Sequence, residues 1–291
     1  MFQRYRNSWQ LVKASWAVLQ SDKQLLLFPI ISAATMILIT IVFLIPAAAI
    51  FGLVGAATGA RGDSADILGY AVLFLFYLVS YTISIFFNVA LVGAAMIRLD
   101  GGSPTLGDGL RLARSKFGII LQYAVISATV GIIFRFIEER LGFLGSIIAW
   151  LGGLAWNVAT YLVVPVLAAK DVSPIDAIKE SASLLKKTWG EQIIADGGMG
   201  FVFFLMSMFV IFVGTFLTIA IGAAVDSPAL VILFILATFI ALIGLAVTAG
   251  ALSGIYQAAL YRYAETGVVP DNFDIEMIKG AFKDKKKKKN D

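Results

Sequence analysis

The chain has 291 residues, of which 59% are apolar and 14% are charged. Soluble domains carry roughly 25% charged residues, so this composition excludes a soluble globular protein and indicates a membrane protein. The sequence contains no cysteine and no histidine, which excludes disulfides, thiolate nucleophiles, imidazole bases and zinc sites made from these side chains.

The first predicted element is an amphipathic helix within residues 1–24. Its apolar side chains Trp9, Val12, Trp16 and Leu19 recur at helical spacing, with arginine, lysine and glutamine between them. This pattern is typical of a helix that lies flat in the membrane interface. An ordinary polar segment that leads into the first span is the alternative.

Six apolar stretches follow, and each reaches the roughly 20 residues that a helix needs to cross hydrocarbon. The sequence therefore predicts an all-α polytopic membrane bundle. The expected spans are about 25–53, 67–97, 117–137, 142–168, 197–225 and 228–262. Polar residues dilute the third span, so a shallow or re-entrant pair made by the third and fourth is the alternative.

Basic residues predict the orientation of these spans, because cytoplasmic loops are enriched in them. In the six-span arrangement one side of the membrane receives 20 of the 23 lysines and arginines. The other side receives only Arg61, Arg135 and Arg140. We therefore predict a protein of the cytoplasmic (inner) membrane with both termini in the cytoplasm.

Two of the cytoplasmic loops carry signals for a helix start. Ser103-Pro104 and Ser173-Pro174 each place a capping serine before a proline. Proline at the first helical position loses no hydrogen bond, because that N–H has no partner within the helix. Short helices are expected at about 104–117 and 174–189.

The pattern Leu-x-[Lys/Arg]-x-x-aromatic recurs three times, each time ahead of a pair of apolar stretches. The copies are Leu11, Lys13 and Trp16; Leu112, Arg114 and Phe117; and Leu184, Lys186 and Trp189. The sequence therefore predicts three parallel repeats of an interfacial helix and a helical hairpin. Chance is the alternative, because a basic amphipathic pattern at a membrane entry arises easily.

These segments and the tail supply the candidate lipid-binding residues. Aromatic rings are favoured at headgroup depth, and basic side chains reach lipid phosphate. The candidates are Trp9, Lys13, Trp16, Arg114, Phe117, Lys186, Lys187 and Trp189, together with Lys285, Lys286 and Lys287 of the block Lys285 to Lys289. A solvated, disordered tail over 263–291 is the alternative for the lysine block.

Uncharged polar side chains lie inside two of the spans. Tyr77, Tyr81, Ser84 and Asn88 share one helical face of the second span, and Asn157 and Tyr161 share one face of the fourth. We expect both faces to point toward the interior, where hydrogen bonds between helices explain them. A polar conduit is the alternative, although ion channels more often carry charged rings.

Charged residues gather at the predicted outer end of the third span, as Arg135, Glu138, Glu139 and Arg140. Their spacing predicts salt bridges along a helix, and binding of an ion or a headgroup is the alternative.

The last span carries a ridge of small residues, Ala246, Gly250, Gly254 and Ala258. Such a ridge lets another helix approach closely, either within the chain or from a second copy or a membrane-protein partner.

The chain also resembles a known family. The likeness rests on Ser8-Trp9-x-Leu11-Val12-Lys13-Ala14-Ser15-Trp16, Ile137-Glu138-Glu139-Arg140-Leu141-Gly142 and Ser173-Pro174-x-x-Ala177-Ile178-Lys179-x-Ser181, among other segments. Together they are similar to a family of prokaryotic multi-pass membrane proteins of unknown function. The resemblance implies a six-span membrane protein, and it implies no activity and no functional residues.

The sequence offers no nucleophile with a base, no paired catalytic carboxylates and no metal motif. We therefore expect a non-enzymatic protein without a cofactor and without a nucleic-acid partner. The favoured function is a membrane scaffold that organises partners or anionic lipids on the cytoplasmic face. The alternative is a channel or a facilitator-type transporter of a small polar solute.

Overall fold

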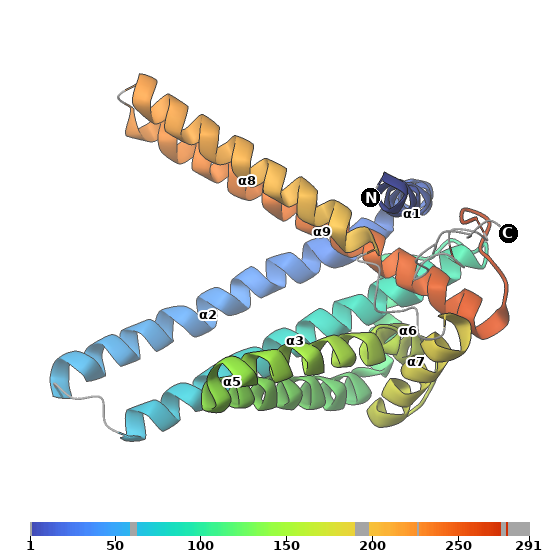
Figure 1. Cartoon of the computed structure of the whole chain (residues 1–291), viewed down its shortest axis with the longest axis horizontal. Helices are drawn as coiled ribbons and strands as arrows, with labels where there is room; N and C mark the ends of the chain where they lie inside the picture. The colour runs from blue at the N-terminus through green and yellow to red at the C-terminus, as the bar shows by residue number, and fades with distance from the viewer. Residues whose placement is uncertain (1, 59–62, 190–197, 226, 275–277, 279–291) are drawn as a thin grey trace, which may run out of the picture. The chain divides into compact units, whose positions relative to one another are not determined.

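The computed structural model describes residues 2–58, 63–189, 198–225, 227–274 and 278. All regular elements in this part of the chain are helices, which confirms the all-α fold class. In chain order they are α1 (Phe2–Ser21), the 3-10 helix η1 (Lys23–Leu26), α2 (Leu27–Thr58), α3 (Asp63–Leu99), α4 (Leu106–Ser115), α5 (Phe117–Thr160), α6 (Val163–Ala169), α7 (Pro174–Trp189), α8 (Gly198–Ala224) and α9 (Pro228–Thr266) (Figure 1).

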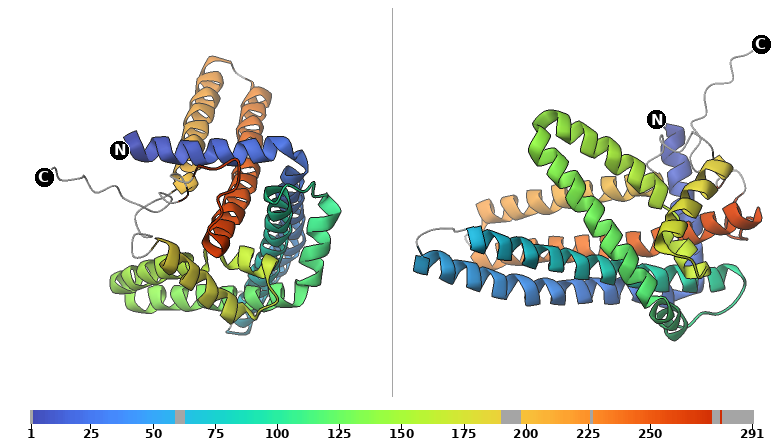
Figure 2. Two further views of the ribbon diagram at one scale, coloured as in Figure 1. Left: turned by 90° about the vertical axis from the view of Figure 1, so that its right-hand side faces the viewer. Right: turned by 90° about the horizontal axis from the view of Figure 1, so that it is seen from below.

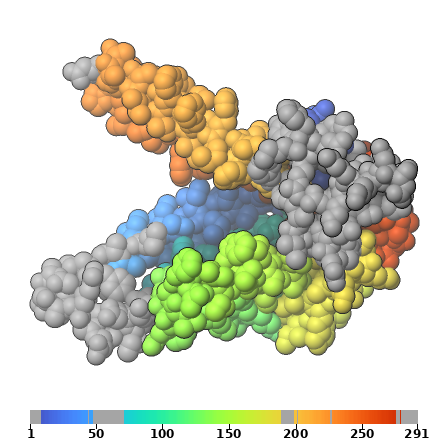
Figure 3. Space-filling view, in the orientation of Figure 1, coloured from blue at the N-terminus to red at the C-terminus, as the bar shows by residue number. Residues whose placement is uncertain are grey.

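Among the residues that the structure describes, five helical segments are long and apolar enough to cross a membrane. They are Lys23–Ala47, Ala71–Leu99, Phe117–Ala169, Val202–Ala224 and Pro228–Thr266. At most 22% of the most apolar window of any of them is buried within the chain. On the α8–α9 surface, drawn in orange in Figure 3, Phe209 and Phe212 are 68% and 71% exposed. Such a surface is unfavourable in water, at about 25 cal/mol per Å², and suits a lipid environment.

α5 consists of two antiparallel arms, as expected for the stretches 117–137 and 142–168. Gly142 has φ 56° and ψ −130°, a conformation outside the helical region that glycine adopts without a Cβ penalty. Beyond this turn the arms approach closely, since a Cβ on Gly145 would lie 2.3 Å from the carbonyl oxygen of Ile137. Figure 2 shows the reversal in green. The number of membrane crossings stays a prediction.

The chain forms two compact units. The first contains residues 1–29, 95–104 and 184–291, and the second contains residues 30–94 and 105–183. Within the first unit, α1 contacts α8 and α9, and η1 contacts α1 and α9. Within the second, α5 contacts both α4 and α6.

The α8–α9 hairpin of the first unit packs through small residues. A Cβ on Gly214 would lie 2.3 Å from Oγ1 of Thr238, and a Cβ on Gly222 would lie 3.4 Å from the side chain of Val231. Because the residue numbers rise along α8 as they fall along α9, both pairs fit one antiparallel packing of the two helices. α1 lies across the end of this hairpin that is far from its turn (Figure 2).

The three predicted repeats join their apolar helices differently. Trp16 lies within α1, and α2 begins eleven residues later, at Leu27. Phe117 is itself the first residue of α5, and Trp189 is the last residue of α7. The parallel-repeat arrangement stays a prediction, because the shared pattern does not stand at one fixed distance from the apolar helix.

Candidate functional site

The outer face of α1 combines two tryptophans with a lysine. Trp9 and Trp16 are 38% and 44% exposed, and Lys13 between them is also exposed. Val18, on the opposite side of the helix from Trp16, is completely buried, and Leu19 is buried as well. Of the predicted stripe Trp9, Val12, Trp16 and Leu19, only Leu19 is buried, and the placement of this stripe in the membrane interface stays a prediction.

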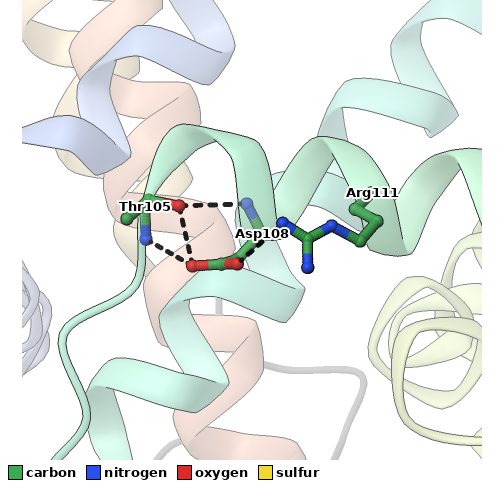
Figure 4. A network of polar contacts seen from close by, with 3 residues as sticks. All are labelled: Thr105, Asp108 and Arg111. Carbon is green, nitrogen blue, oxygen red and sulfur yellow. Dashed lines mark hydrogen bonds and ion pairs between the residues drawn. The ribbon is translucent and has the colours of Figure 1, made fainter.

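α4 begins with a capping box at Thr105 (Figure 4). The Thr105 hydroxyl accepts a hydrogen bond from the backbone N–H of Asp108 at 3.2 Å, and the Thr105 N–H donates to the Asp108 carboxylate at 3.0 Å. Arg111 lies 3.6 Å from the same carboxylate. The bonds from Thr105 hold the pKa of Asp108 below its usual range, and Arg111 adds to this effect. The predicted start at Ser103-Pro104 is therefore wrong, because Thr105 with Asp108 supplies the complete box.

α7 begins in the same way at Ser173, as predicted. The Ser173 hydroxyl accepts a hydrogen bond from the Asp176 N–H at 3.2 Å and donates to the Asp176 carboxylate at 2.7 Å. Lys179 lies 3.5 Å from that carboxylate. The bond from Ser173 lowers the pKa of Asp176, and Lys179 lowers it further. α4 and α7 thus share a capping hydroxyl, an acid three residues on and a base six residues on.

The distance from the capping residue to the Leu-x-[Lys/Arg]-x-x-aromatic pattern differs between α4 and α7. Leu112 lies seven residues after Thr105, whereas Leu184 lies eleven residues after Ser173. The difference of four residues is about one helical turn. Relative to its cap, the third copy of the pattern therefore stands one turn further along its helix.

A buried hydrogen bond joins α7 to the break between α5 and α6. Pro165 has no N–H, and its ring clashes with the carbonyl four residues earlier, which interrupts the helix at Tyr161 and Leu162. The N–H of Leu162 donates instead to the hydroxyl of Ser181 at 3.0 Å. Ser181 and its neighbour one turn earlier, Ala177, are completely buried. The resemblance motif that ends at Ser181 thus has a structural role.

Charged groups link the same region of the second unit. Lys116, between α4 and α5, is only 8% exposed, and its ammonium donates to the backbone carbonyl of Lys170 at 3.0 Å and pairs with Asp171. Lys170 in turn pairs with Glu180 of α7. The α4–α5 junction, the α6–α7 loop and α7 therefore form one polar junction.

In the first unit the loop after α3 is held by two arginines. Arg262 of α9 pairs with Asp100 at 2.8 Å and donates to the carbonyl of Leu99. Arg98 donates to the hydroxyl of Ser21 at the end of α1, at 3.1 Å. These contacts were not predicted, because their partners are 77 and more residues apart in the sequence.

The charge cluster beside the Gly142 turn forms the predicted helical salt bridge. Arg135 lies 2.9 Å from Glu139, and both side chains are more than 60% exposed. Arg140 stacks over the ring of Phe136, at 5.1 Å from its centroid. Glu138 accepts a hydrogen bond from Ser146 of the returning arm at 3.5 Å. Local contacts therefore explain the whole cluster.

The expected polar interior is wrong for most of its members. Tyr77 and Tyr81 are 43% and 41% exposed, Asn88 and Asn157 are exposed, and Ser84 and Tyr161 are half-buried. The buried face of α3 instead contains Thr82, Ile85 and Val89. Each of these follows a member of the polar stripe by one residue, which turns the face by about 100°.

Four further candidates are exposed, as a lipid-facing role requires: Arg114, Phe117, Lys186 and Lys187. The side chain of Trp189 and all of Lys285, Lys286 and Lys287 lie outside the described residues. In the small-residue ridge, Gly254 and Ala258 are buried and Ala246 is exposed. A Cβ on Gly250 would lie 3.6 Å from Pro29, so part of the ridge already packs within the chain.

Comparison with known proteins identifies the family of the chain but assigns no activity to it. A family model described as a family of unknown function, DUF6159, matches residues 67–270, which is more than half of the chain. No curated protein matches the sequence. The matched region runs from α3 to just beyond α9 and contains the polar junction of α4 to α7. The chain therefore belongs to the DUF6159 family, a family of unknown function.

Proposed function

We propose that this protein is a non-enzymatic membrane scaffold that holds anionic lipid on its cytoplasmic face through α1. The exposed pair Trp9 and Trp16, with Lys13 between them, carries this proposal. An indole ring is favoured at headgroup depth, where its apolar body and its N–H are both accommodated. A lysine near an anionic surface gains about 1 kcal/mol.

The position of α1 supports the same role. Within the first unit, α1 lies across the end of the apolar α8–α9 hairpin rather than alongside it (Figure 2). If the hairpin inserts along the membrane normal, α1 lies near the membrane plane with its tryptophans facing outward. A transport function has weaker support, because Tyr77, Tyr81 and Asn88 do not line an interior.

The depth of the two tryptophans tests the proposal. Variants of the full chain that keep one tryptophan each, with the others changed to phenylalanine, are reconstituted in bilayers of brominated lipids. Trp9 and Trp16 should be quenched best by bromines near the glycerol backbone. Trp150, exposed on the apolar second arm of α5, is the control and should be quenched best by deep bromines. Tryptophans of α1 that no lipid quenches would refute the proposal.

The contribution of basic side chains to the binding of anionic lipid is tested separately, by lipid retention in native mass spectrometry. Lys13→Gln should retain less phosphatidylglycerol than the parent at low salt, and Lys179→Gln, on a side chain already paired with Asp176, should change retention less. Deleting residues 285–291 should add a loss that disappears near 1 M salt, where the Debye length is about 3 Å. Equal retention by Lys13→Gln and parent would remove the electrostatic part of the proposal.

A further inference from the structure

One face of α3 presents a row of polar side chains. The face consists of Tyr77, Tyr81, Ser84 and Asn88, and none of these side chains forms a hydrogen bond with any residue that the structure describes. Three of the four are exposed. In hydrocarbon no water replaces a missing partner, so each unpaired group is unfavourable. The members of this face that lie within hydrocarbon therefore require polar groups opposite them.

The depth of Asn88 makes lipid a poor partner. Asn88 precedes Leu99, the last residue of α3, by eleven residues, which is about 17 Å along a helix. The apolar span ends at Leu99, and the hydrocarbon core of a bilayer is about 30 Å thick. Measured from Leu99, Asn88 therefore lies near the middle of the core and Ser84 lies within it, whereas Tyr77, at about 33 Å, lies beyond it. Acyl chains there have no donors or acceptors for an amide.

We propose that a second copy of this chain covers this face, with the two α3 helices parallel in a symmetric dimer. Both copies insert with the same orientation, so a twofold axis along the membrane normal places Asn88 opposite Asn88 and Ser84 opposite Ser84. A primary amide has both donors and an acceptor, so two facing asparagines can exchange two hydrogen bonds. The small-residue ridge of α9 is less suited to this contact, because Gly254 and Ala258 are buried within the chain.

Disulfide cross-linking tests the contact in a chain that has no native cysteine. Ser84→Cys and Ile83→Cys are adjacent in depth and equally half-buried, but they point about 100° apart. The full-length variants are oxidised in dilute lipid vesicles. A parallel α3 pair brings the facing residues within disulfide range, so Ser84→Cys should form covalent dimers about tenfold faster than Ile83→Cys. Equal rates, or dimers of neither variant, would overturn the proposal.

The hydrogen bonds are tested by the dimer affinity, measured through energy transfer between labelled copies in vesicles. Asn88→Leu should weaken the dimer by about fivefold to tenfold, the loss expected for two membrane hydrogen bonds. Asn157→Leu, which removes an exposed asparagine from α5, should leave the affinity unchanged. An unchanged dimer affinity for Asn88→Leu, or an equal loss of affinity in both variants, would exclude this face. Cross-linking of Ser84→Cys in native membranes to a different protein alone would assign the face to that partner and overturn the dimer.

Discussion

The hydroxyl of Ser181 accepts the backbone N–H of Leu162 at 3.0 Å, across a helix break that Pro165 produces. In a continuous helix this N–H would donate to the carbonyl of Val158, which the N–H of Tyr161 takes at 3.3 Å instead. α7 thus supplies the partner that the broken helix lacks. One serine couples the α7 helix to the end of an apolar arm.

Replacing this serine should be costly. Ser181→Ala leaves the buried N–H of Leu162 unpaired, which should lower the free energy of unfolding by about 1–3 kcal/mol. Ser15 is the matched control, because it is equally buried and its hydroxyl has no partner among the described residues. Thermal unfolding in detergent should therefore show a lower Tm for Ser181→Ala and little change for Ser15→Ala. Equal changes in Tm for the two variants would mean that the hydrogen bond to Leu162 does not stabilise the fold.

The α8–α9 contact should not tolerate one added methyl group. Gly214→Ala places a Cβ against Thr238, whose branched side chain has three atoms within 3 Å of that position, and overpacking of this kind costs about 1–3 kcal/mol. Gly244→Ala is the control on α9, where nothing lies within 4 Å of the new Cβ. Only Gly214→Ala should lower the Tm. An unchanged Tm for that variant would contradict the close approach of the two helices.

The two capping aspartates should make the protein sensitive to acid. Their pKa values are lowered in the folded state from an ordinary value of 3.8. Asp108 and Asp176 therefore make their full contribution to the free energy of unfolding above about pH 4. It is lost as the pH falls through the folded pKa values. The variant Asp108→Asn/Asp176→Asn should therefore lose less Tm between pH 4 and pH 2 than the parent. Carboxyl NMR titration checks the cause, and midpoints at or above 3.8 would exclude it.

Orientation can be tested at two exposed positions of the second unit. Arg114 lies at the α4–α5 end of the first arm, and Phe143 is 81% exposed beside the Gly142 turn. If basic residues face the cytoplasm, an impermeant maleimide added to intact cells should label Phe143→Cys, and it should label Arg114→Cys only after permeabilisation. The opposite labelling pattern would invert the proposed topology.

The features that the sequence determines by itself are those that depend on residues close together in the chain. The membrane class, the positions of the apolar helices, the turn before Phe143 and the cap at Ser173 depend on neighbouring residues, so they could be predicted. The cap at Thr105 is equally local, and the pair Thr105 and Asp108 is a sequence pattern that predicts it. The neighbouring Ser103-Pro104 predicts a helix start two residues earlier, which is why the cap predicted from the sequence alone is wrong. The family resemblance rested on short motifs of the same kind.

The tertiary structure decided which face of each helix is covered. A shift of one residue separates exposed Tyr81 from buried Thr82, and hydrophobicity distinguishes these faces poorly when nearly every side chain is apolar. The partner of Ser181 lies 19 residues away, and the partner of Arg262 lies 163 residues away. No local pattern specifies such pairs, because they arise only when separate helices pack together.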